Sequence, residues 1–100
     1  AQEAVEQLKL AVAARPDHAG VHNSLGTARE DLGTPDKAFA EYQEALRLDP
    51  DYASAYLNLA SLLYQRGEYA AAAQHLAKAQ SLGLVVDPTL ASEIRRHLER

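Results

Sequence analysis

The chain has 100 residues, the usual length of one small domain. Its 14 acidic and 10 basic side chains give a net charge of −4, which argues against nucleic-acid binding, because such proteins normally carry a basic surface. The absence of cysteine excludes disulfides, thiolate catalysis and cysteine-ligated zinc. No apolar run approaches the roughly 18 residues of a membrane span, so none is expected.

The composition favours helices over strands. Alanine occurs 20 times and leucine 15 times, whereas valine and isoleucine together occur 6 times. Alanine and leucine are strong helix formers, and β-branched residues are the natural strand formers. Apolar residues recur at intervals of three and four rather than alternating, which predicts an all-α fold.

In chain order, the pattern predicts helices at residues 2–14, 19–32, 35–48, 53–66, 69–81 and 88–100. Gly33 and Gly67 stand where helices must end, since glycine accepts the left-handed conformation after a helix. Thr34 before Pro35 is typical of an N-cap followed by the first helical residue. Asp87 is expected to cap the last helix.

The chain repeats itself at a spacing of 34 residues. Small, large and turn residues recur in the same order without gaps. The positions that coincide are Ala4, Ala38 and Ala72; Leu8, Tyr42 and Leu76; Ala11, Ala45 and Ala79; Leu25 and Leu59; Gly33 and Gly67; and Pro16 and Pro50.

This period and residue order resemble the tetratricopeptide repeat. Residues 19–52 and 53–86 match complete repeats, residues 2–18 match the second half of one, and residues 87–100 suit a capping helix. The positions that carry the resemblance are His22, Leu25, Gly26, Arg29, Ala38, Tyr42, Ala45 and Pro50, then Tyr56, Leu59, Ala60, Leu63, Ala72, Leu76, Ala79 and Leu84. The resemblance implies one domain, a right-handed α-solenoid of antiparallel helix pairs.

In that family the first helix of each repeat lines a concave surface, and the usual role is non-catalytic binding of a peptide or protein segment. The residues expected to line the groove are Asn23, Thr27, Glu30, Asp31, Asn58, Ser61, Tyr64 and Gln65. Asn58 offers a paired donor and acceptor to a peptide backbone. Because Glu30 and Asp31 repel an acidic ligand, a neutral or basic segment is the expected partner.

The N-terminal segment carries an apolar stripe of Ala4, Val5, Leu8, Ala11 and Val12. One side of the stripe is expected to cover helix 19–32, and the other side is expected to stay open. Self-association through Val5, Leu8 and Val12 is therefore predicted. The missing half-repeat and the initial Ala1 favour a cut through a longer array. The alternative functions are a self-assembling scaffold segment and a regulatory part of a larger protein.

Catalytic and metal-binding interpretations find little support. The five glycines are isolated at turns, so no phosphate-binding loop is expected. His18 and His22 have a spacing that could bind a metal, but His18 falls at a helix boundary, so they should not share a face. His22 is interpreted as a packing residue. The sequence therefore predicts no enzyme activity, no cofactor and no metal. The lack of cysteine is equally compatible with the cytoplasm and the periplasm.

Overall fold

The computed structural model describes residues 2–14 and 18–99, and these residues form six α-helices. Their bounds are α1 (Gln2–Ala14), α2 (Ala19–Asp31), α3 (Pro35–Leu48), α4 (Ala53–Gln65), α5 (Tyr69–Ser81) and α6 (Pro88–Leu98). The all-α prediction is confirmed for the described part of the chain. Each predicted helix is present and begins at the predicted residue.

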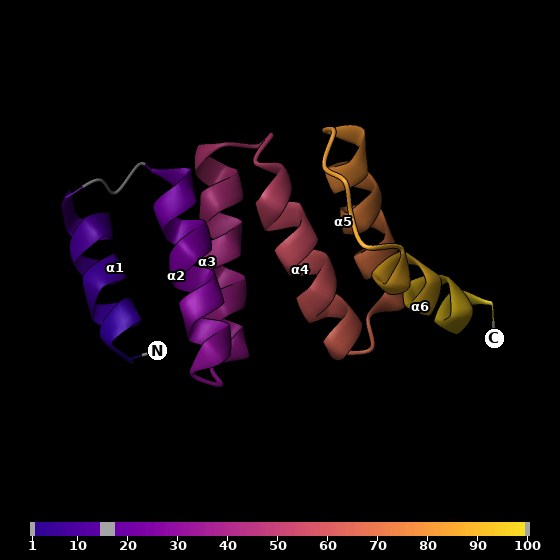
Figure 1. Cartoon of the computed structure of the whole chain (residues 1–100), viewed down its shortest axis with the longest axis horizontal. Coiled ribbons are helices and arrows are strands. Elements are labelled where there is room, and N and C mark those ends of the chain that lie inside the picture. Colours follow the sequence, from indigo (N-terminus) through magenta and orange to yellow (C-terminus); the bar gives the residue numbers. More distant parts are fainter. Residues whose placement is uncertain (1, 15–17, 100) are drawn as a thin grey trace.

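The helices run alternately up and down and follow one another along the long axis of the molecule (Figure 1). The principal extents are 45 × 27 × 18 Å. The most intimate pairs are α2 with α3 and α4 with α5, which are the helix pairs that the repeat predicts. At the C-terminal end, α6 lies obliquely against α5 (Figure 1). The chain therefore builds its core between successive helices rather than around one centre.

Small residues allow the paired helices to approach closely. A Cβ atom on Gly26 would lie 2.4 Å from Cε1 of Tyr42, so only glycine fits where α2 crosses α3. Ala60 has the equivalent place on α4 and is fully buried against Leu76 of α5. Tyr42 itself has no exposed surface. The small repeat positions thus lie where the helices cross, and the large ones fill the space between them.

The helix ends follow the predicted turn residues. Gly33 and Gly67 have φ angles of 77° and 81°, in the left-handed region that favours glycine. Asp87 accepts a hydrogen bond from the backbone N–H of Thr89 at 2.8 Å and so caps α6. Thr34 stands before α3, but its hydroxyl donates to the carbonyl of Arg29 at 2.9 Å. Thr34 is therefore the N-cap residue of α3 and Pro35 its first residue, as predicted, although the Thr34 hydroxyl bonds to the end of α2 rather than to the first turn of α3.

The last helix departs from the repeat spacing by one residue. Ile94 packs against Ala72 and Leu76 of α5, just as Leu59 packs against Ala38 and Tyr42 of α3. Leu59 and Ile94 are 35 positions apart, because the connection 82–87 is longer than the connection 49–52. We call α2 and α4, the first helices of their repeats, first-type helices, and α1, α3 and α5 second-type helices. By its packing α6 is a third first-type helix, with Arg95 in the place of Gly26 and Ala60.

Candidate functional site

The first-type helices α2 and α4 carry all eight residues predicted to line the groove, and we call the surface they form the α2–α4 face. Two of these residues, 35 positions apart, bridge the helices directly: Asn58 Nδ2 donates to Asn23 Oδ1 at 3.0 Å. Both side chains are half-buried. One N–H of Asn58 is therefore already engaged. The amide pair still retains a second N–H and the Asn58 oxygen, which are the groups that a peptide backbone requires.

One turn further along α2, a hydrogen-bonded chain ties Thr27 and Glu30 to Tyr42 of α3. The Thr27 Oγ1 and Tyr42 hydroxyl oxygens are 3.3 Å apart, and the Tyr42 hydroxyl donates to Glu30 Oε2. Burial of the Tyr42 hydroxyl, reinforced by the Glu30 carboxylate, raises the pKa of Tyr42 well above its ordinary value. From the sequence, Tyr42 was expected only as a large repeat position. Its ring is buried, but its hydroxyl reaches the α2–α4 face and holds Glu30.

Three predicted residues meet at a single hollow. A depression of about 410 Å³ is lined by Glu30 and Asp31 from α2, Gln65 from α4, and by Gly33, Pro35 and Leu62. Asp31 and Gln65 are exposed, and Glu30 is half-buried. At its edge, Arg66 pairs with Asp36 at 2.6 Å, which leaves Glu30 and Asp31 as the carboxylates that face the hollow. The hollow is therefore acidic, with an amide opposite the two acids.

Tyr64 lies apart from this hollow. Its ring makes edge contacts with Tyr69 and His97, at centroid distances of 5.5 and 5.6 Å, and its hydroxyl donates to Glu93 of α6 at 3.4 Å. His97 in turn stacks on Tyr69 with centroids 4.1 Å apart. Burial and the nearby Glu93 carboxylate raise the pKa of Tyr64. Tyr64 therefore lies at the junction of α4, α5 and α6. The remaining predicted residue, Ser61, is half-buried one turn before Gln65 on α4.

The N-terminal stripe faces inward more than predicted. Val5 is 1% exposed and packs against Leu25 and Ala28 of α2, with Leu8 beside them. Val5 therefore cannot contribute an open surface, and that part of the prediction was wrong because α2 covers the stripe on this side. The side chain of Val12 lies outside the described residues. The exposed large apolar residue of α1 is Leu10, at 66%.

The described histidines do not assemble a metal site. His18 is exposed, whereas the buried His22 lies with its Nδ1 atom 3.0 Å from Glu41 Oε1. Because a carboxylate only accepts, the Nδ1 proton is donated to Glu41. Within the described residues no group of three or more histidine, aspartate or glutamate side chains could hold a metal ion. None of the described helices is both long and apolar enough to cross a membrane.

The fold and the two small-residue helix crossings define the class: an all-α solenoid built from helix-pair repeats. Comparison with known sequences then gives the family. The family model described as tetratricopeptide repeat matches residues 1–53 and 25–83. The chain belongs to the tetratricopeptide-repeat family.

Curated relatives are much longer than this chain. Residues of the chain are 40% identical over 70 positions to protein FlbA of Caulobacter vibrioides, covering 70% of the chain and 12% of FlbA. They are 31% identical over 102 positions to the protein O-mannosyl-transferase TMTC1 of Mus musculus, covering 98% of the chain and 11% of that protein. The peroxisomal targeting signal receptor of Eremothecium gossypii is 32% identical over 78 positions, which are 78% of the chain and 14% of the receptor.

Two solved structures share the fold. The crystal structure of MamA superposes with a TM-score of 0.76 at 25% identity, over 81% of this chain and 47% of that one. The Yersinia enterocolitica type III secretion chaperone SycD, solved with a peptide of the translocator YopD, gives a TM-score of 0.79 at 23% identity, over 98% of this chain and 76% of SycD. Membership of the tetratricopeptide-repeat family supports a protein-interaction module.

Proposed function

We propose that the chain is a non-catalytic interaction module whose α2–α4 face binds an extended peptide segment carrying a basic side chain. The observation that carries this proposal is the acidic hollow, where Glu30, Asp31 and Gln65 converge. A lysine or arginine side chain is long enough to enter such a hollow, and carboxylates and an amide oxygen are its natural acceptors.

The rest of the face suits the backbone of the same segment. The Asn23–Asn58 pair crosses between α2 and α4 and keeps donor and acceptor groups available. Tyr42 holds the Glu30 carboxylate from the core side, so this acceptor is positioned before a ligand arrives. The peptide held by SycD is a property of that protein, but it illustrates that a chain with this fold can bind a peptide.

The proposal is tested by selecting binders from a random peptide library displayed on phage, followed by titration of the selected peptides. Lysine or arginine should be enriched at one position. Asp31→Lys should then weaken binding about tenfold, because like charges face each other across the hollow. Asp31 is exposed, so this variant should keep its helicity and melting temperature.

The matched control is Asp51→Lys, which makes the same charge change at an exposed residue in the turn between α3 and α4, outside the hollow. It should leave the affinity unchanged. Selected peptides without a basic residue, or equal weakening by the two variants, would count against the proposal. Selected peptides without a basic residue would contradict the basic ligand. Equal weakening by the two variants would show that binding responds only to the net charge of the protein.

A further inference from the structure

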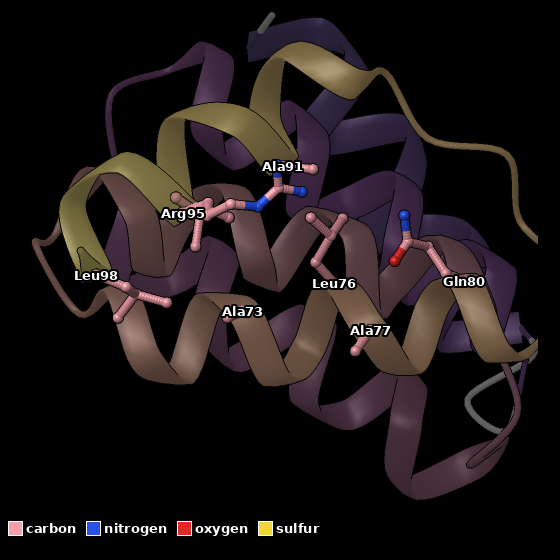
Figure 2. Close-up of a pocket in the computed structure, with 8 residues that line it drawn as sticks. Ala73, Leu76, Ala77, Gln80, Ala91, Arg95 and Leu98 are labelled. Atoms are coloured by element: carbon pink, nitrogen blue, oxygen red, sulfur yellow. The ribbon is translucent and has the colours of Figure 1, made fainter.

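A second hollow lies at the C-terminal end, between α5 and α6. We call it the terminal groove; it has a volume of about 210 Å³ and is lined mainly by Ala73, Leu76 and Ala77 of α5 and by Ala91, Arg95 and Leu98 of α6. Figure 2 shows the side chains of the two helices along its length, with Arg95 extending between them. Leu98 is 48% exposed, which leaves an apolar side chain uncovered at this surface.

The repeat shows what normally covers this surface. The equivalent residues of the preceding repeat lie on α3 and α4, and α5 packs against these two helices. Ala60 of α4 belongs to the buried cluster that contains Ala72 and Leu76 of α5, and Phe39 of α3 packs against that cluster. One repeat earlier, Tyr42 of α3 covers Gly26 of α2. The terminal groove therefore has the position that a second-type helix occupies in the complete repeats, and no described helix lies in it.

The chain also carries a second-type helix, α1, one face of which no described helix covers. Ala4 of α1 is exposed, whereas its equivalents Ala38 and Ala72 have no exposed surface. Gln7 is exposed as well. Its equivalents contact the first helix of their own repeat. Glu41 of α3 is bonded to His22 of α2, and the ring centroid of His75 of α5 lies 6.0 Å from that of Tyr56 of α4.

We propose that α1 of a second copy docks in the terminal groove, so that copies join head to tail and continue the solenoid. The open face of α1 and the terminal groove are then the two halves of one repeat, completed between molecules. Such a contact uses two different surfaces and therefore extends into chains rather than closing as a symmetric dimer.

Charge is consistent with this pairing. The last turn of α6 carries the exposed Arg95, and the first turn of α1 carries the exposed Glu3, whereas Arg96 and Glu6 are already paired with Glu93 and Lys9 within the chain. Arg95 stands in the place of Gly26 and Ala60, so α1 of the second copy sits farther from α6 than α3 does from α2. Leu8 of α1 takes the place of Tyr42 in this contact. The docked helix therefore presents a shorter side chain where the arginine leaves less room.

Sedimentation of the 100-residue chain over a concentration series tests the proposal. The wild type should grow from monomers into longer species as its concentration rises. Ala4→Glu and Ala77→Glu each place a carboxylate in one half of the contact, and each should weaken association on the order of tenfold or more. Both residues are exposed, so the variants should fold as the wild type does.

The matched controls are Leu10→Glu on α1 and Gln74→Glu on α5, which add the same charge at exposed positions off the contact. They should associate like the wild type. A mixture of Ala4→Glu and Ala77→Glu should form a one-to-one dimer that grows no further, because each variant keeps one intact half.

A wild type that stays monomeric at every concentration overturns the proposal. So does a mixture of the two variants that stays monomeric, since both intact halves are then present without pairing. Loss of association in Leu10→Glu would overturn it too, by showing that the exposed leucine, rather than the open face of α1, holds the copies together. None of these outcomes depends on peptide binding at the α2–α4 face.

Discussion

The helix pairs α2–α3 and α4–α5 have the same arrangement but reach it with different side chains. The first combines the smallest residue, Gly26, with the large ring of Tyr42, and the second combines Ala60 with Leu76. A gain in volume on one helix is matched by a loss on the other. The repeat therefore keeps the summed volume of the two side chains nearly constant, because the helices must keep one separation.

The two pairs differ in polarity as well. In the first, the buried His22 donates to Glu41, and Tyr42 bonds to Thr27 and Glu30. In the second, the equivalent contacts are between rings or apolar side chains, such as Tyr56 with His75. The first pair thus depends on hydrogen bonds that are satisfied in only one geometry. The second depends mainly on apolar burial, which is less directional.

The largest expected effect comes from breaking the size match. Gly26→Ala places a methyl group within 2.4 Å of the Tyr42 ring, which must shift although it is fully buried. Overpacking costs about 1–3 kcal/mol, and better helix propensity returns up to about 1 kcal/mol. We expect a net loss of about 2 kcal/mol in the free energy of urea unfolding.

The double variant Gly26→Ala with Tyr42→Leu converts the first pair into a copy of the second. It should be more stable than the sum of the two single changes predicts, with a coupling of about 1 kcal/mol or more. Additive effects in this cycle would show that the two residues do not share one space, and the size-match explanation would then fail.

The hydroxyl of Tyr42 is the next target. Tyr42→Phe keeps the ring and removes the bonds to Thr27 and Glu30, so unfolding free energy should fall by about 1–2 kcal/mol at neutral pH. The pKa of Tyr42 is raised in the folded chain, so the wild type loses stability as the pH rises above the ordinary tyrosine value of 10.0. The difference from Tyr42→Phe should therefore shrink in alkali.

Urea unfolding measured between neutral pH and about pH 11, just above the tyrosine range, checks this prediction. Tyr56→Phe is the control, since the Tyr56 hydroxyl donates to the backbone carbonyl of Pro50 at an exposed site. A gap between wild type and Tyr42→Phe that stays constant across this range would rule out the proposed coupling of the hydroxyl to folding.

A smaller effect is expected at the other polar contact of the first pair. Glu41→Ala removes the carboxylate that accepts from the buried His22, and should lower the unfolding free energy by about 1 kcal/mol. Glu44→Ala on the same helix removes an exposed partner of Arg47 and should change little. Equal effects of the two changes would mean that the first pair gains nothing from its buried polar contact.

Local and periodic features were predictable from the sequence. The helix bounds, the glycine turns and the crossing of small with large residues follow from spacing, because each depends on side-chain size at a fixed interval. The partial burial of Glu41 was not predictable from spacing, because its partner His22 lies on another helix. The role of the Tyr42 hydroxyl was missed for the same reason.

The candidate site was predicted only in part. The repeat register placed Glu30, Asp31 and Gln65 on one face, and the structure brings them together. Tyr64 was expected there too, but the contact with His97 and Glu93 depends on the oblique seat of α6. The longer connection before α6 places its packing residue Ile94 35 positions after Leu59, one more than the 34-residue spacing of the repeat.

The smallest expected effect concerns how first-type helices begin. His18 and Tyr52 precede α2 and α4 without any side-chain cap bond in the described structure, whereas Asp87 caps α6. The inner helices are packed between neighbours, so a local bond adds little there. The outermost helix has fewer contacts, and its first turn depends more on the cap.

Asp87→Ala should therefore lower the melting temperature slightly and increase hydrogen exchange in the first turn of α6, leaving α2 and α4 unchanged. The bond from Thr89 lowers the pKa of Asp87, so its contribution to stability is present above the ordinary aspartate pKa and is lost as the pH falls through the folded value. The variant and the wild type should converge in acid. Exchange that increases equally in α4 would contradict this view, because the cap would then stabilise the whole solenoid rather than its last, one-sided helix.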